Sequence, residues 1–159
     1  MDKVIDLKKP KKKRSNCDEI PTLTSSEYME YVQSFFVENT RLDKSIEKKM
    51  ASEIRKKLGS YKIQDVKKAR YDEPSFITMD NVYEKLLTSK MMCYYCNEPV
   101  CVFYTSARQD NQWTLERIDN AFQHTNENTV IACLDCNLKR STRNSEHFQF
   151  AKQLTIKKI

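Results

Sequence analysis

Glycine is almost absent from this chain: its 159 residues include one glycine, Gly59, beside four prolines. Glycine-rich phosphate-binding loops, such as the dinucleotide-binding fingerprint and the P-loop, need several glycines in one turn, because only glycine lets the backbone approach phosphates closely. The sequence therefore excludes both loops, and with them the nucleotide-dependent dehydrogenases and the P-loop NTPases.

Long apolar runs are also lacking. No stretch approaches the roughly 18 consecutive apolar residues of a membrane-spanning helix, and no apolar segment of the secretory kind follows Met1. We therefore expect an intracellular protein in a reducing compartment, without a membrane partner. An apolar content of 39% against 31% charged residues predicts a modest core with an extensive solvated surface.

Residues 1–20 have the composition of a disordered tail, with a dense basic run around one proline. The run resembles a nuclear import signal, which implies a nuclear location and a eukaryotic cell or a virus that replicates in one. An arm that binds phosphates nonspecifically, or a merely solubilising tail, would have the same composition. The basic residues are Lys8, Lys9, Lys11, Lys12, Lys13 and Arg14.

Residues 21–90 have the hydrophobic spacing of helices. Thr24-Ser25-Ser26-Glu27 matches a capping box, and the aromatic residues over 28–36 then recur on one helical face. Such a stripe is more often core than a surface for stacking bases.

Three further helices are expected in this region. One begins after Asp43 and ends at Gly59, because glycine readily takes the left-handed conformation that closes a helix. A short basic helix covers 61–70, and another begins at Thr78. The basic outer faces of these helices could contact phosphates or could simply be solvated. The region could also bind a protein partner or self-associate.

Two C-x-x-C pairs, Cys93/Cys96 and Cys133/Cys136, are the strongest motif in the chain. Two such turns can direct four sulfurs into one tetrahedral zinc site, and a site filled by four thiolates is structural and not catalytic. A redox motif is disfavoured because no βαβ pattern surrounds either pair. Plain buried cysteines are the remaining interpretation.

The residues around the two pairs have the composition of strands and loops rather than of helices. We expect a knuckle, a hairpin with strands Val100–Tyr104 and Trp113–Arg117, a loop over Ile118–Asn128, and a second knuckle that opens a helix. This is the order of a treble-clef zinc module.

The expected fold class is therefore α+β, with a helical region followed by a small zinc-bound ββα module. The expected boundaries are a tail at 1–20, helices at 21–90, the zinc module at 91–144 and a final helix at 145–159.

The motifs of residues 91–143 resemble those of the HNH (His-Me finger) endonuclease superfamily, in its four-cysteine zinc-containing branch. That branch has C-x-x-C, an acidic residue usually followed by His, HT-x-x-N before an apolar run, and C-x-x-C-N followed by basic residues. Between and after the two cysteine pairs, the corresponding segments are Glu116-Arg117-Ile118-Asp119, His124-Thr125-Asn126-Glu127-Asn128 and Asn137-Leu138-Lys139-Arg140.

The resemblance implies hydrolysis of DNA with one divalent metal, Mg²⁺ or Mn²⁺, which stabilises the leaving 3′ oxygen. It assigns Glu116 and Asn137 as ligands of that metal and Asn128 as the residue that fixes the loop. Lys139, Arg140 and Arg143 could then bind flanking phosphates.

The departure from the family is Arg117, which stands where the general-base histidine should be. Arginine keeps its proton at neutral pH, but it can clamp a phosphate. Three interpretations follow: His124 could act as the base, a metal-bound water could react without a protein base, or the site could only bind. His124 could equally be a histidine that orders the loop, and Asp119 a supplementary ligand or a loop cap.

Three functions therefore compete. The first is a metal-dependent nuclease that cuts or nicks DNA. The second is a non-catalytic zinc module that binds nucleic acid or a protein. The third is a structural adaptor that holds the helical region against a partner.

Overall fold

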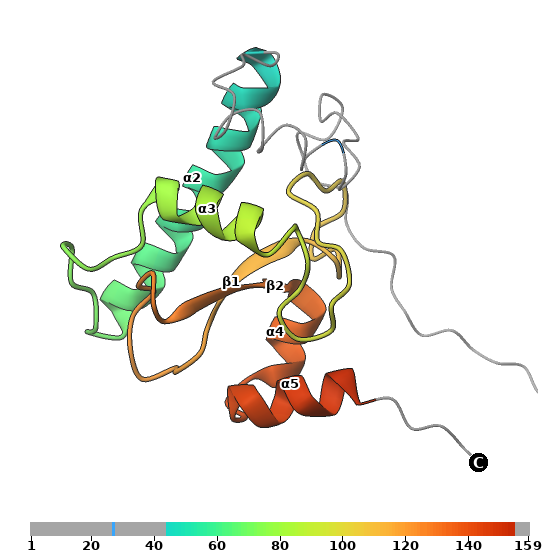
Figure 1. Ribbon diagram of the computed structural model, residues 1–159. Coiled ribbons are helices and arrows are strands. Elements are labelled where there is room, and N and C mark those ends of the chain that lie inside the picture. Colours follow the sequence, from blue (N-terminus) through green and yellow to red (C-terminus); the bar gives the residue numbers. More distant parts are fainter. Residues whose placement is uncertain (1–26, 28–43, 155–159) are drawn as a thin grey trace, which may run out of the picture.

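The computed structural model describes Glu27 and residues 44–154, and it has a mixed α+β architecture (Figure 1). The described residues form four helices and one two-stranded antiparallel sheet. The predicted basic tail and the helix expected after Thr24 lie outside these residues, as do residues 155–159. None of the described helices has the length and apolar character that crossing a bilayer requires.

Helix α2 spans Lys44–Lys67 without interruption, so the prediction that it ends at Gly59 is wrong. Gly59 has no positive φ, and the helix expected over 61–70 is largely the last part of α2. A glycine inside a helix costs only about 1 kcal/mol relative to alanine. Contacts made on both sides of it, by Ile54 in the core and by Asp65 near the end of the helix, outweigh that cost.

Helix α3 spans Met79–Thr88 and begins where the sequence predicted. Thr78 Oγ1 accepts a hydrogen bond from the Asn81 backbone N at 3.2 Å, and Asn81 Oδ1 accepts one from the Thr78 backbone N at 3.1 Å. This reciprocal capping box satisfies two backbone donors that a helix start would leave unpaired. Val82, Tyr83 and Leu86 face the core.

The sheet pairs β1, Trp113–Arg117, with β2, Thr129–Cys133, in a register that sets Trp113 opposite Cys133 and Arg117 opposite Thr129. The predicted hairpin between Val100–Tyr104 and β1 is wrong: the earlier segment contributes only an isolated bridge from Cys101 to Gln112. Its valines and aromatic residues are buried core side chains. Such residues are enriched in strands largely because they suit buried surfaces, so composition alone did not separate the two cases.

Helix α4, Leu134–Arg140, follows β2 directly, as predicted for the second knuckle. Helix α5, Ser145–Gln153, confirms the expected final helix over those residues. The side chain of Asn144 starts α5 by accepting a hydrogen bond from the His147 backbone N at 3.0 Å.

One hydrophobic core joins the helical region to the cysteine-containing region. It includes Met50 and Ile54 of α2, Leu86 of α3, Trp113 of β1 and Phe148 of α5. Figure 1 shows the sheet between the α2–α3 pair and the α4–α5 pair. Because this core is continuous, the helices on both sides of the sheet are held in fixed positions relative to it.

Candidate metal centre and adjoining pocket

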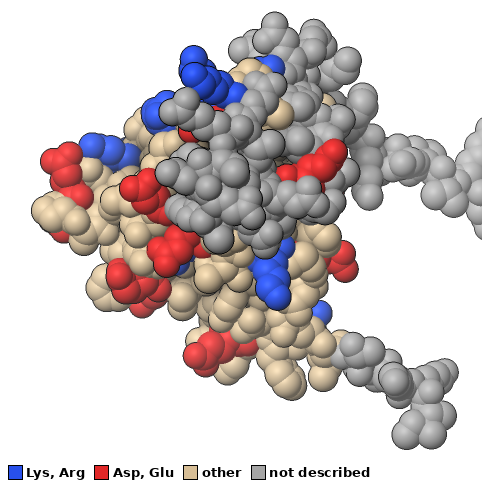
Figure 2. All heavy atoms as spheres, turned by 45° about the horizontal axis from the view of Figure 1, so that its top comes forward, with Lys and Arg blue, Asp and Glu red and all other residues tan. Residues whose placement is uncertain are grey.

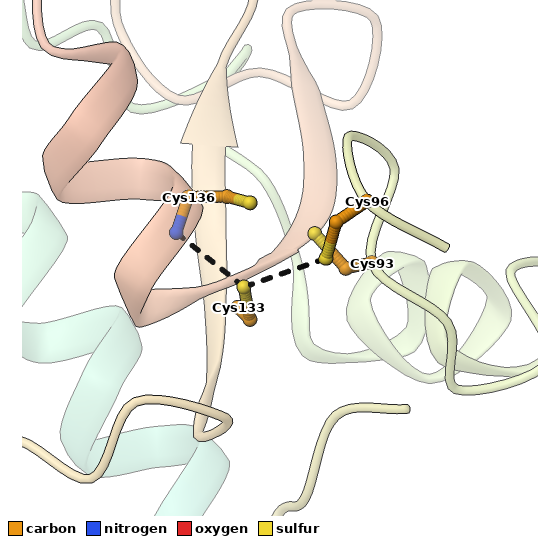
Figure 3. A group of neighbouring side chains, drawn as sticks. All are labelled: Cys93, Cys96, Cys133 and Cys136. Atoms are coloured by element: carbon orange, nitrogen blue, oxygen red, sulfur yellow. Dashed lines mark hydrogen bonds between the residues drawn. The ribbon is translucent and has the colours of Figure 1, made fainter. Parts of the chain in front are cut away.

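The four cysteines of the two C-x-x-C pairs meet in one buried cluster. Cys93 and Cys96 lie on the first knuckle, Cys133 ends β2, and Cys136 lies in the first turn of α4, with the four side chains turned toward one another (Figure 3). Their sulfurs all lie within 4.8 Å of one another. The left-handed Asn97, whose φ is 55°, reverses the chain after Cys96 and brings the first pair into place.

This cluster could hold a metal ion. A tetrahedral zinc with Zn–S bonds of about 2.3 Å needs sulfurs roughly 3.8 Å apart, and Cys96 Sγ and Cys133 Sγ are 3.9 Å apart. A hydrogen bond with Cys133 lowers the pKa of the Cys93 thiol to about 5. The hydrogen bond with Cys93 raises the pKa of Cys133, and burial raises that of Cys136, so binding a metal to all four sulfurs would release protons. The donor set fits a structural zinc ion.

An open pocket of about 310 Å³ lies between α2 and the sheet. It brings together residues that are far apart in the sequence. Four of the residues assigned by the family resemblance line it: Glu116, Arg117, His124 and Asn137. Helix α2 supplies part of the opposite wall, including Tyr61.

Glu116 is buried, with 6% of its surface exposed, and is paired with Arg140. Arg140 Nη1 donates to Glu116 Oε1 at 2.5 Å. Burial raises the pKa of Glu116 above its ordinary value, and the Arg140 guanidinium opposes that shift. One carboxylate oxygen is thus engaged, and no described residue hydrogen-bonds the other.

Arg140 does not occupy the exposed position that binding a flanking phosphate would require. Its exposed fraction is 3%, and besides Glu116 it donates to the carbonyl oxygens of Arg117 at 2.9 Å and Ile118 at 2.6 Å. These carbonyls lie where β1 ends and the ladder no longer pairs them. Arg140 therefore stabilises the start of the loop after β1.

Asn137, the second expected metal ligand, donates from Nδ2 to Thr114 Oγ1 at 3.2 Å. This bond fixes the amide so that Oδ1 is the atom left for a ligand. Asn137 Oδ1 and the second oxygen of Glu116 are hard oxygen donors on one pocket wall, and such donors suit Mg²⁺ or Mn²⁺. The two residues fit a hard divalent cation in donor chemistry.

Arg117, at the end of β1, lines the pocket with its guanidinium held on two sides. Nη1 donates to the Phe122 carbonyl at 3.2 Å and lies 3.6 Å from Asp65 Oδ1. Its side chain is only 15% exposed. A guanidinium held this way is a fixed positive charge at the pocket wall, suited to an anionic group.

His124 is buried against α2. Its Nδ1 lies 2.7 Å from Asp65 Oδ2, and its backbone N donates to the same oxygen at 2.9 Å. The imidazole packs on the Tyr61 ring with the centroids 4.6 Å apart. Burial lowers the pKa of His124 while Asp65 opposes that shift, so the neutral ring is favoured.

The loop over Ile118–Asn128 is closed by Asn128, which lies outside the pocket lining. Asn128 Nδ2 donates to the carbonyls of Asp119 at 2.9 Å and Gln123 at 3.0 Å, and Oδ1 accepts from the Asp119 backbone N at 2.9 Å. Asp119 Oδ1 accepts from the Ala121 backbone N at 2.8 Å, which is the geometry of a loop cap.

The two other basic residues expected to contact nucleic acid lie on the surface. Lys139 forms an exposed ion pair with Asp135 at 2.8 Å, and Arg143 lies over the Phe148 ring at 5.9 Å. Among the described residues on the face in Figure 2, basic and acidic side chains are interspersed and form no unbroken basic area.

Sequence reasoning missed the contribution of α2. Asp65 belongs to a helix whose outer faces are mostly basic, and no motif marks it. Gln123 was missed as well: its side chain joins the loop to the 72–75 segment through the Asp72 backbone, accepting at 2.7 Å and donating at 3.0 Å. The one available signal for Asp65 was an acidic residue within a basic stretch.

Comparison of the chain with protein-family models, with curated proteins and with solved structures finds no match.

Proposed function

We propose that this protein is an HNH-like, metal-dependent endonuclease that cleaves or nicks DNA by hydrolysing a phosphodiester. The observation that carries the proposal is the pocket in which Glu116, Arg117, His124 and Asn137 converge, in a chain that also gathers four cysteines in one cluster. The sequence places these residues in the order of that superfamily, and they are separated by up to 21 positions along the chain. In this proposal β1, β2 and α4 form the ββα unit of a treble-clef module, and structural zinc holds it.

The residues of the pocket have complementary tasks. Arg117 offers a fixed positive charge that can bind a nonbridging phosphate oxygen, and Asp65 keeps its guanidinium in place. Glu116 and Asn137 would hold Mg²⁺ or Mn²⁺ through oxygen atoms on one wall. Such a metal supplies stabilisation of the negative charge on the leaving oxygen. Arg140 opposes the rise in the pKa of Glu116 that burial causes.

A plasmid-nicking assay with the full chain tests this function. Wild-type protein with Mg²⁺ or Mn²⁺ should convert supercoiled plasmid to the nicked form, and chelation of that metal should stop the reaction. Asn137→Ala and Glu116→Gln should each lower the rate by at least about 100-fold, the usual scale for a lost charge-stabilising group. Asp135→Asn, on the exposed part of the same helix, is the matched control and should cleave normally.

Folding must be verified for each variant by circular dichroism and by zinc content, because Glu116→Gln removes the partner of a buried arginine. Normal cleavage by both Asn137→Ala and Glu116→Gln would place the reaction elsewhere.

A second candidate is a zinc module that binds nucleic acid without cutting it. The Glu116–Arg140 pair favours it, because a carboxylate already bonded to a guanidinium is a weaker ligand for a cation. This function predicts DNA affinity that falls linearly with salt concentration on logarithmic axes. It also predicts no cleavage with any divalent metal. Affinity that does not respond to salt would argue against binding through phosphates.

A further inference from the structure

We propose that Asp65 of α2 positions His124 as the proton acceptor of the pocket, so that the helical region supplies part of the reaction site. The inference rests on the proposed nuclease function and gives it the base that Arg117 cannot be.

The contact between the two side chains sets which ring nitrogen is available. Asp65 is fully buried, and its Oδ2 lies 2.7 Å from His124 Nδ1. A carboxylate at that distance accepts the Nδ1 proton, which leaves Nε2 with its lone pair. Among the described residues none hydrogen-bonds to Nε2, and the His124 side chain lines the pocket.

The carboxylate is held in turn by two arginines. Arg70 Nε donates to Asp65 Oδ1 at 3.0 Å, and Arg117 Nη1 lies 3.6 Å from the same oxygen. Burial raises the pKa of Asp65, but the hydrogen bonds from the His124 backbone N and ring, followed by the bond from Arg70, lower it overall. The second oxygen therefore remains an acceptor for the imidazole.

Packing also fixes the orientation of the His124 ring. Tyr61 packs on it at a centroid distance of 4.6 Å and an interplanar angle of 32°. The backbone of His124 is fixed as well, because its carbonyl oxygen accepts a hydrogen bond from the Ile77 backbone N at 2.9 Å. A histidine that only ordered the loop could do so through its backbone. Here the Nδ1 bond also fixes the ring of a residue that lines the pocket.

The step that this arrangement supports is proton removal from water. Nε2 takes one proton from a water molecule, the water oxygen forms a bond to phosphorus, and the bond from phosphorus to the 3′ oxygen breaks. The leaving oxygen takes a proton from solvent, and the imidazolium later releases its proton to solvent. Asp65 stays ionised throughout and stabilises the imidazolium.

Kinetics of plasmid nicking by the full chain test the inference. His124→Gln and Asp65→Asn should each lower kcat by about 100-fold or more, the scale of a lost general base, with KM changed less than threefold. The double variant should be no slower than His124→Gln alone, because the two residues act as one unit. His147→Gln and Asp80→Asn, both exposed, are the matched controls and should keep the wild-type rate.

The outcomes separate the two proposals. If Asn137→Ala abolishes cleavage while Asp65→Asn and His124→Gln cleave at the wild-type rate, the nuclease function holds and the inference fails. If the wild-type protein never nicks DNA, both fail. Additive losses in the double variant would also overturn the inference.

A chemical rescue covers the case in which Asp65→Asn does not fold. His124→Ala leaves space at the pocket, and added imidazole should raise its nicking rate at least tenfold while leaving His147→Ala unchanged. The rate should follow the fraction of neutral imidazole as pH varies. The charged and titratable groups that face this position are Asp65 and Tyr61 of α2, Arg70, and Arg117 of β1. A folded, zinc-containing His124→Ala protein that imidazole cannot rescue would overturn the inference.

Discussion

Two buried polar clusters hold this protein together by different physical means. The four cysteines join the first knuckle to the end of β2 and the start of α4, entirely within the region expected to be the zinc module. The cluster around Asp65 joins α2 to the loop after β1 through His124, Arg117 and Arg70.

The difference concerns what each cluster needs from solution. Metal binding to thiolates supplies folding free energy directly and fails when the ion is removed. The Asp65 cluster needs no ion, but its strength depends on the ionisation of its members. The two clusters should therefore respond to different perturbations, one to chelation and the other to pH.

Removing a metal ion from the four-cysteine site should have the largest effect. Chelation, or Cys96→Ser, should abolish the cooperative unfolding transition, since structural zinc contributes about 10–16 kcal/mol in small fingers. The shared core predicts that the helices lose their packing together with the sheet. Circular dichroism and metal analysis of the purified protein measure this. Cys101→Ser is the control, because Cys101 lies outside the cluster. A chelated protein that kept its melting transition would show that the cysteines are merely buried.

Breaking the Glu116–Arg140 pair should come next. Arg140→Met leaves a buried carboxylate and two carbonyls without a partner, and loss of one member of a buried pair typically costs about 3–5 kcal/mol. Urea unfolding measures the change, with Arg143→Met as the surface control. A loss below about 1 kcal/mol would mean that the pair is effectively solvated and contributes little to the stability of this end of the sheet.

The pH response of the Asp65 cluster should be smaller. Burial lowers the pKa of His124, so the unfolded chain binds the proton more readily than the folded protein. Stability is then fully present above about pH 6.5, the ordinary value for histidine. It falls as pH drops below that value toward the lower pKa of the folded state.

His124→Gln should flatten this dependence of the unfolding free energy below about pH 6.5, measured by urea unfolding at each pH. The lowered pKa of Asp65 acts in a separate range, because its contribution is lost only as pH falls through and below its ordinary value of 3.8. His147→Gln is the control. An unchanged slope in His124→Gln would mean that His124 is not the group responsible.

The smallest effect is expected at Gly59, which belongs to neither cluster. No heavy atom lies within 4 Å of the position that an added Cβ would occupy. Gly59→Ala should therefore stabilise the protein by up to about 1 kcal/mol, seen as a higher melting temperature. A lower melting temperature would indicate that helix α2 is strained at this point.

The parts of the fold that were predictable from the sequence are those set by local signals. Thr78 and Asn81 form a capping box within one turn, and the C-x-x-C spacing brings each pair of sulfurs together without help from the rest of the chain. The end of α2 was misjudged because tertiary contacts outweighed the preference of a single glycine. The β1 partner was misjudged because burial and pairing favour the same residues.

The candidate site likewise has residues that the sequence predicted and residues that it did not. The order of Glu116, His124 and Asn137 along the chain predicted a shared site, and the structure brings all three to one pocket. Arg140 was expected to bind a flanking phosphate, whereas its position at the end of α4 directs it to Glu116. Asp65 could not be found because its contact with His124 spans 59 positions and obeys no spacing rule.

The bonds from α2 to the loop have a consequence for transplanting this module. A fragment cut at the expected boundary of residue 91 would keep both C-x-x-C pairs and every family motif. It would lose Asp65 and Arg70, as well as the Ile77 backbone N that bonds the His124 carbonyl. Such a fragment could bind zinc and still leave its imidazole unoriented. The smallest unit that keeps the pocket intact therefore begins within α2, more than two dozen residues before Cys93.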